Sequence, residues 1–197
     1  LENPNPTAAI YCKTGECEIR ITARAQNDAE AQTMCRAYAK KFYDLLGDAV
    51  YDEDVAGLED TVVHTLRANG LTIATAESCT GGQVAARITA FPGSSSVYRG
   101  GVVSYWSEVK RDALGVPWPL IEEHGAVSDP CARAMAEGAR KLTGADLAVS
   151  VTGVAGPDSD ERGNPVGLVF IALATSEGTF CRRTENGSSR RCLIQEV

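Results

Sequence analysis

The sequence predicts an α/β fold, a three-layer-like sandwich with a mostly buried mixed sheet, preceded by a small α+β unit. Leu71–Ala76 is predicted as a short buried strand, and the continuous apolar runs at Leu147–Val151 and Val166–Ala174 are also typical of buried strands. Segments with helical periodicity alternate with these runs, which favours helices packed on a sheet. At 197 residues the chain is long enough for one good core and a small appendage. We place the two domains at residues 1–52 and 53–197.

The first unit is predicted from a strand pair and one helix. Ala8–Cys12 and Glu18–Arg24 are strand candidates on either side of a turn. Asn27 followed by Glu30 resembles a capping box that starts a helix, and Gly47 supplies its end. The residues expected on the inner face of this helix are Ala31, Cys35, Tyr38, Phe42 and Leu45.

The second unit is predicted as alternating helices and strands. A helix with Val55, Leu58, Val62 and Leu66 on one face ends at Gly70, before the strand at Leu71–Ala76. Ser128 caps a later helix that ends at Thr143 and turns Ala132, Met135, Ala136, Ala139 and Leu142 inward. The other expected elements are a helix at Gln83–Ile88, a strand at Tyr98–Tyr105, short helices at Glu108–Leu114 and Trp118–Glu123, and a last strand that ends near Thr184.

Composition narrows the function classes. The net charge of −7 argues against sequence-independent nucleic-acid binding, so we expect no nucleic acid partner. Seven scattered cysteines, of which only Cys12 and Cys17 are close in sequence, complete no zinc site, so we expect free thiols and no metal. No signal peptide or membrane-length apolar run is visible, which predicts a cytoplasmic protein without membrane contact. The start at Leu1, without a methionine, suggests a piece of a longer chain.

The most informative motif is Ala76-Glu77-Ser78-Cys79-Thr80-Gly81-Gly82, between a predicted strand and a predicted helix. Such a turn directs backbone N–H groups and the positive end of a helix toward one point. A serine hydroxyl there could attack a carbonyl while N–H groups hold an oxyanion or a phosphate. The alternative is that Ser78 or Thr80 only caps the helix and the glycines only make the turn tight.

A serine nucleophile needs a base, and lysine is a better candidate than histidine in this chain. His64 lies inside a predicted helix and His124 at a helix end, and no aspartate–histidine pairing is apparent. Lysine can act as the base where burial lowers its pKa from about 10.4. Lys110 closely follows the strand that ends at Tyr105, and sites in α/β folds gather at strand carboxyl ends.

Two further features could contribute to the same pocket. The phenol of Tyr105 could relay a proton or hold a catalytic amine, although an aromatic plug at a strand end is the alternative. The segment Val151–Pro157 runs from a strand into a loop with Gly153 and Gly156, whose N–H groups could bind phosphate. Neither glycine loop matches a Walker or dinucleotide-binding motif, and we expect no cofactor.

These segments together resemble the CinA carboxy-terminal domain family, known as nicotinamide mononucleotide amidohydrolase. The resemblance rests on the serine turn, Phe91-Pro92-Gly93-Ser94-Ser95, Gly100-Gly101-Val102-Val103-Ser104-Tyr105 with Lys110, Gly125-Ala126-Val127-Ser128, and Val151-Thr152-Gly153-Val154-Ala155-Gly156-Pro157 with Pro165-Val166-Gly167. It runs from about Val55 to about Thr184. Residues 1–52 resemble the KH-type linker domain of full-length CinA proteins, in which a molybdopterin-binding-like domain credited with ADP-ribose pyrophosphatase activity comes first.

The resemblance implies a role for each matching residue. Ser78 matches the nucleophile, Lys110 the base and Tyr105 the third catalytic residue. Thr152 matches a position that lines the substrate pocket, and Arg190 is compared with an arginine thought to meet substrate. Further substrate contacts are expected from the backbone N–H groups of the two loops, at Cys79, Thr80, Gly81, Gly82, Gly153 and Gly156. The family's last strand is usually followed by an aromatic residue, a glycine, a polar residue and an arginine. In this chain the aromatic residue is missing and Arg190 stands one place late.

The leading hypothesis is a metal-free serine amidohydrolase that deamidates nicotinamide mononucleotide to nicotinate mononucleotide and ammonia. Its partner is then a small nucleotide substrate, with a homodimer as one oligomeric option. One alternative is a non-catalytic nucleotide-binding module with a regulatory role in competence or the damage response. Another is a redox sensor based on Cys79, whose thiol lies near a predicted helix start.

Overall fold

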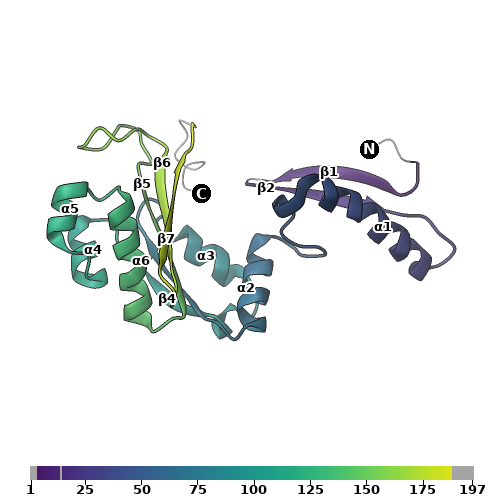
Figure 1. Cartoon of the computed structure of the whole chain (residues 1–197), viewed down its shortest axis with the longest axis horizontal. Coiled ribbons are helices and arrows are strands. Elements are labelled where there is room, and N and C mark those ends of the chain that lie inside the picture. The colour runs from purple at the N-terminus through teal and green to yellow at the C-terminus, as the bar shows by residue number, and fades with distance from the viewer. Residues whose placement is uncertain (1–3, 14, 188–197) are drawn as a thin grey trace. The chain divides into compact units, whose positions relative to one another are not determined.

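The computed structural model describes residues 4–13 and 15–187, and the chain divides into two compact units between Leu58 and Glu59 (Figure 1). The boundary at 52/53 stays a prediction. The mixed α/β architecture expected from the sequence is confirmed, with a two-stranded sheet in the first unit and a five-stranded sheet in the second. No helix in the described part of the chain is both long enough and apolar enough to span a bilayer.

The first unit consists of a hairpin and one long helix. Strands β1 (Thr7–Lys13) and β2 (Glu16–Thr22) are antiparallel, and helix α1 (Asp28–Leu46) packs on β2 before the short 3₁₀ turn η1 (Gly47–Ala49). The expected cap is present, because the Asn27 side chain accepts from the Glu30 N–H at 2.9 Å. The prediction that Leu45 lies on the inner face of this helix is wrong. Leu45 is 80% exposed, because the small sheet covers only part of a nineteen-residue helix.

The second unit is built on a sheet of strand order β4-β3-β5-β6-β7. The strands are β3 (Ile73–Glu77), β4 (Tyr98–Val103), β5 (Leu147–Gly153), β6 (Leu168–Ala174) and β7 (Thr179–Glu185). Strand β3 runs parallel to both neighbours, whereas β5, β6 and β7 are joined in antiparallel order. The carboxyl ends of β3, β4 and β5 therefore meet at one edge of the sheet, where ligand sites of α/β folds form.

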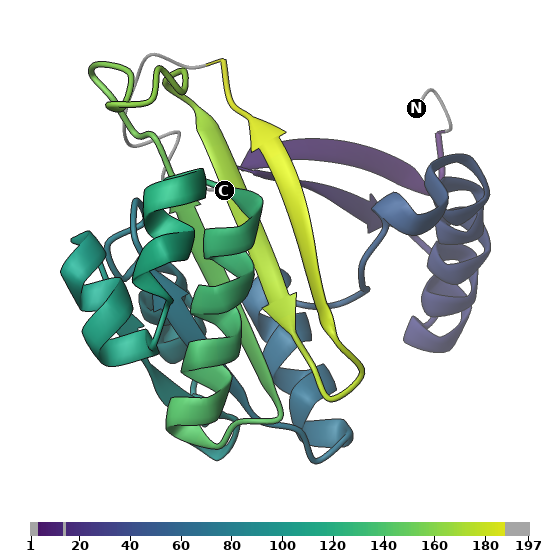
Figure 2. The same ribbon diagram turned by 60° about the vertical axis from the view of Figure 1, so that its left-hand side comes forward.

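Helices cover both faces of this sheet, which gives three layers (Figure 2). One face packs against α2 (Leu58–Ala68) and α3 (Gln83–Ala90), and the short turn η2 (Ser94–Ser96) leads into β4. The other face packs against α4 (Ser107–Leu114), α5 (Trp118–His124) and α6 (Asp129–Thr143). Side chains alternate along a strand, so Ala74 and Ala76 face α6 while Ile73 faces α2.

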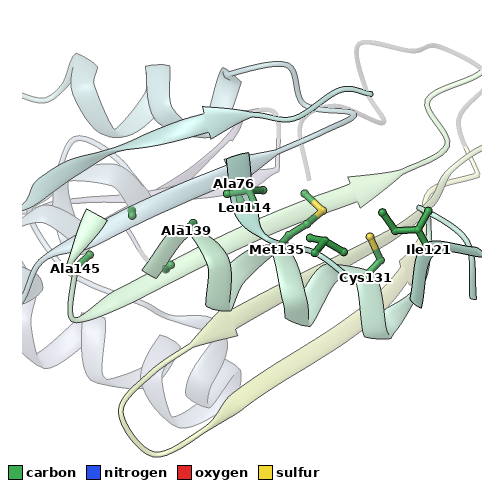
Figure 3. Close-up of a cluster of buried hydrophobic side chains, with 10 residues drawn as sticks. Ala76, Leu114, Ile121, Cys131, Met135, Ala139 and Ala145 are labelled. Carbon is green, nitrogen blue, oxygen red and sulfur yellow. The ribbon is translucent and has the colours of Figure 1, made fainter. Parts of the chain in front are cut away.

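Helix α6 supplies the largest part of the core (Figure 3). Its Cys131, Met135 and Ala139 are fully buried against Ala76 and Leu114. Leu142, expected to turn inward, is 58% exposed, because it lies one turn beyond the part of the helix that packs on the sheet. A Cβ on Gly138 would lie 2.0 Å from the Leu114 carbonyl oxygen, so a glycine lets α4 approach α6 closely. This close packing fixes helix α4, which carries Lys110.

Candidate active site

Ser78 follows β3 directly and lies at the carboxyl edge of the sheet. Its N–H donates to the Val151 carbonyl at 2.9 Å, which continues the pairing of β3 with β5 by one residue. Ser78 is only 8% exposed, and it follows Ala74 and Ala76 on the face of the sheet that packs against α4 and α6. The serine hydroxyl is therefore held between a rigid strand and the helix that carries Lys110.

Lys110 meets Ser78 inside the protein. Its Nζ donates to Ser78 Oγ at 2.9 Å, to the Ser104 carbonyl at 2.6 Å and to the Tyr105 carbonyl at 3.4 Å. Lys110 is 1% exposed, and no larger side chain is fully buried among the described residues. Burial lowers the pKa of Lys110, and only partial opposition comes from the nearby thiols of Cys131 and Cys79. Among the described residues no carboxylate contacts this buried amine, and such an environment brings a lysine toward its neutral form.

The turn after Ser78 is organised by Glu77, a residue to which the sequence analysis gave no role. One carboxylate oxygen of this buried side chain accepts from Thr80 Oγ1 at 2.7 Å and from the Gly82 N–H at 2.9 Å. It also accepts from the Val84 N–H, and the other oxygen accepts from the Ala85 N–H at 2.8 Å. Glu77 thus caps the first turn of α3 from inside. A carboxylate at the end of an apolar strand was the signal that could have revealed it.

This cap corrects part of the sequence prediction. The Gly82 N–H is taken by Glu77 and the Gly81 N–H donates to the Ser78 carbonyl at 3.1 Å, so neither is open to an anion in this arrangement. The two glycines are instead explained by the backbone conformation of the turn, because both have positive φ, 62° and 104°. Within residues 4–13 and 15–187, the Thr80 N–H has no acceptor, so this donor, two residues after Ser78, remains available to an oxyanion.

The other predicted residues lie around this centre in different ways. Tyr105 presents its backbone carbonyl to Lys110, while its side chain is 51% exposed beyond the end of β4. Thr152 is fully buried beside Ser78 in the β5 register, and its hydroxyl donates to the Ala126 carbonyl at 2.8 Å. Cys79 is 3% exposed and packs among Val151, Ala155 and Val169. A thiol so enclosed does not fit the redox-sensor alternative.

The glycines of the second loop are structural in this arrangement. A Cβ on Gly153 would lie 2.7 Å from the Leu168 carbonyl oxygen, and one on Gly156 would lie 3.0 Å from the Val166 side chain. Close packing of the loop onto β6 and its flank therefore explains both residues. Arg190, expected to contact substrate, lies outside the described residues.

A cavity of about 440 Å³ lies at the opposite edge of the sheet and is lined by residues that include Glu137, Arg140 and Asp146. Ser78 and Lys110 do not line it. In its walls the Thr179 hydroxyl donates to Glu137 Oε1 at 2.8 Å in an exposed setting. The candidate site is therefore defined by the buried Ser78–Lys110 contact rather than by this cavity. No group of three or more potential metal ligands occurs in the described part of the chain.

Comparisons with known proteins agree on one family. The CinA C-terminal domain model matches residues 55–197, and the CinA KH domain model matches residues 1–51. A CinA-like protein from Dictyoglomus turgidum is 47% identical over 169 residues, which cover 86% of this chain and 41% of the relative. One from Prochlorococcus marinus is 42% identical over 198 residues, which cover 100% of this chain and 46% of the relative. The chain thus spans less than half the length of these relatives.

Solved structures give the same result for the fold. The competence/damage inducible protein CihA from Agrobacterium tumefaciens matches with a TM-score of 0.69 and 37% identity, over 75% of this chain and 90% of that one. The competence damage-inducible protein A from Klebsiella pneumoniae matches with a TM-score of 0.67 and 36% identity, over 68% and 83% of the two chains.

Proposed function

The chain belongs to the CinA family, and we propose that its second unit is a serine amidohydrolase that uses Ser78 as the nucleophile and Lys110 as the base. The observation that supports this proposal most strongly is the 2.9 Å contact between Lys110 Nζ and Ser78 Oγ, both of which are buried. Nicotinamide mononucleotide, which becomes nicotinate mononucleotide and ammonia, is the substrate that we propose.

The neutral amine of Lys110 fits the acceptor role. Two of its N–H groups can donate to the carbonyls of Ser104 and Tyr105, and its lone pair then faces Ser78. In that state the hydrogen bond is reversed and the serine hydroxyl donates to Nζ. Ser78 Oγ attacks the carboxamide carbon, its proton passes to Lys110, and the resulting ammonium protonates the departing nitrogen, which leaves as ammonia.

The second half of the reaction uses the same residues. Water attacks the acyl ester on Ser78 while Lys110 accepts a proton, and that proton returns to Ser78 Oγ as the nicotinate product leaves. The Thr80 N–H is the donor that we assign to the oxyanion of each tetrahedral intermediate. One well-placed oxyanion donor contributes about 3–4 kcal/mol to transition-state stabilisation.

The proposal is tested by ammonia release from three compounds: nicotinamide mononucleotide, nicotinamide riboside and nicotinamide. We expect turnover of the mononucleotide, and a kcat/KM at least about tenfold lower without the phosphate, because binding energy from the remote group positions the amide. Equal rates on the riboside and its 5′-phosphate would contradict the substrate assignment and leave the amidohydrolase chemistry standing.

The alternative to an enzyme is a non-catalytic nucleotide-binding module, and a binding experiment distinguishes the two. Calorimetric titration of wild type with nicotinamide mononucleotide measures binding independently of turnover. Binding without any ammonia release, in a chain that stays folded by circular dichroism, would contradict the enzymatic proposal and favour the module. Ammonia release that persists unchanged in Ser78→Ala would place the chemistry elsewhere in the chain.

A further inference from the structure

Two exposed cysteines face each other in the first unit, far in sequence from the candidate active site. In the hairpin of β1 and β2, Cys12 is the direct cross-strand partner of Cys17, next to the closing pair Lys13 and Glu16. Both cysteines are free and exposed. The hairpin therefore presents two thiols side by side to solvent.

The position of this pair in the ladder suits a disulfide. Directly opposed residues of an antiparallel pair alternate between hydrogen-bonded and non-hydrogen-bonded sites. The pair that closes a two-residue hairpin loop is hydrogen-bonded, so the next pair, Cys12 and Cys17, occupies a non-hydrogen-bonded site. Cα atoms there are about 4.5 Å apart, inside the range of about 4.4–6.8 Å that disulfides span. The two thiols also lie in contact, since a hydrogen bond between their side chains raises the pKa of Cys17.

We propose that Cys12 and Cys17 form an oxidisable dithiol that reacts with a low-molecular-weight disulfide and closes into a cross-strand disulfide. The thiolate of one cysteine attacks a sulfur of the small disulfide, forms a mixed disulfide and releases one small thiolate. The second cysteine then attacks the protein sulfur of that mixed disulfide and releases the other small thiolate. The protein loses two electrons and two protons, and the small disulfide is reduced to two thiols.

The other described cysteines are poorer reactants. Cys79 and Cys131 are buried, while Cys35 and Cys181 are half-buried. Burial raises the pKa of Cys131 to about 11 and, together with Asp129, that of Cys181 to about 12, so both thiols stay protonated near neutral pH. Cys192 lies outside the described residues and is therefore controlled by a variant in the test.

The dithiol also stands next to contacts that hold the segment after α1. Tyr51 donates its hydroxyl to Glu16 Oε2 at 2.5 Å, and Lys13 Nζ donates to the Ala56 carbonyl at 3.3 Å, all within the first unit. Both hairpin residues belong to the pair adjacent to the two cysteines. A covalent link at that point restrains the two strands that carry these contacts, so oxidation should slow the opening of residues 51–56.

The test uses the full chain, reduced and then incubated with glutathione disulfide, alkylated and analysed by intact mass and peptide mapping. We expect a loss of two hydrogens and a peptide that joins Cys12 to Cys17. Cys12→Ser and Cys17→Ser should instead keep a stable glutathione adduct on the remaining cysteine. The matched controls Cys35→Ser and Cys192→Ser should still form the link.

Two results would overturn the proposal. One is a stable glutathione adduct on Cys12 or Cys17 of the wild type, and the other is alkylation of these thiols no faster than that of Cys35. Hydrogen exchange at residues 51–56 tests the effect on the neighbouring segment. At least about threefold slower exchange in the oxidised chain is expected, and equal exchange in the two states would refute the restraint.

Discussion

The two ends of strand β3 both carry polar groups that join it to neighbouring elements, and they differ chiefly in burial. At the amino end, Thr72 donates its N–H and its hydroxyl to Asp146 Oδ2 at 2.8 and 2.7 Å, and this aspartate is exposed. At the carboxyl end, Ser78 meets a Lys110 that is 1% exposed. Water can replace the first contact when it breaks, whereas the second is largely shielded from bulk solvent.

The difference in burial shows that the energetically costly contact, a buried lysine, lies at the carboxyl end of β3. An exposed Asp–Thr pair satisfies the backbone at a strand start, and its hydrogen bonds lower the pKa of Asp146 and favour its ordinary ionised form. Burial of Lys110 instead lowers its pKa and destabilises its charged form. An apolar side chain could fill the same space without this cost. This contrast leads us to expect that changes at the carboxyl end affect activity and changes at the amino end affect stability only.

Ser78→Ala should have the largest effect on turnover. We expect kcat to fall by at least about 10⁴-fold, because no other group replaces the attacking oxygen. Alanine fits the turn, so the melting temperature should change little. The exposed Ser95→Ala in η2 is the matched control for ammonia-release kinetics, and a Ser78→Ala variant as active as this control would disprove the assignment.

Lys110→Arg should be the next most damaging change. A guanidinium stays protonated and cannot accept the serine proton, so kcat should fall by about 10²–10⁴-fold. Lys141→Arg, an exposed substitution on α6, should leave the rate unchanged. If Lys110→Arg kept more than half of the wild-type rate, the lysine would supply only charge and the base would have to be another group.

Glu77→Gln, at the buried carboxyl end of β3, should lower both stability and activity. The amide nitrogen cannot accept the N–H groups that the carboxylate now receives, so at least one partly buried backbone N–H loses its acceptor. We expect the free energy of unfolding to fall by about 1–3 kcal/mol in urea titrations. Because Glu77 holds the turn after Ser78, kcat should fall together with the free energy of unfolding. Gln83→Ala, exposed in the same turn of α3, should change both less, and an equal loss would contradict the proposed cap.

Thr72→Ala should have the smallest effect. The Thr72 N–H still donates to Asp146 in the variant, and water can solvate the exposed carboxylate when the hydroxyl is removed. We expect a loss of stability smaller than that of Glu77→Gln and unchanged kcat and KM for ammonia release. A kinetic effect as large as that of Lys110→Arg would show that the two ends of β3 do not differ as proposed.

The sequence predicted the parts of this site that depend on local pattern. The apolar run before Ser78, the glycines after it and the Ser128 cap all follow from short-range rules, and the α/β class was confirmed. The environment of Lys110 could not be predicted in the same way. Its amine is held by the carbonyls of Ser104 and Tyr105. Every residue has a backbone carbonyl, so residue types alone do not reveal such contacts.

The remaining errors have a related cause. Helical periodicity assigns Leu45 and Leu142 to inner faces, but it does not show where the packing partner of a helix ends. The N–H groups of Gly81 and Gly82 were expected to meet an anion, because loop pattern alone cannot reveal that the turn already uses them. The proposed roles of the Tyr105 side chain and of Arg190 stay predictions.

The central claim is that Lys110 can be a neutral amine beside Ser78. If its folded-state pKa lies below its unfolded value of about 10.4, the rate rises with pH up to the folded-state pKa. Between these two values the unfolded chain binds the extra proton, so Lys110 makes the folded chain more stable as pH increases across that window.

The most direct measurement is the titration of the Lys110 side chain by NMR in the full chain, with the Cε resonance assigned by its loss in Lys110→Arg. We predict a midpoint well below about 10.4 that coincides with the midpoint of the kcat/KM profile for ammonia release. A Lys110 midpoint at or above that of the exposed Lys141 in the same spectra would contradict the proposed mechanism.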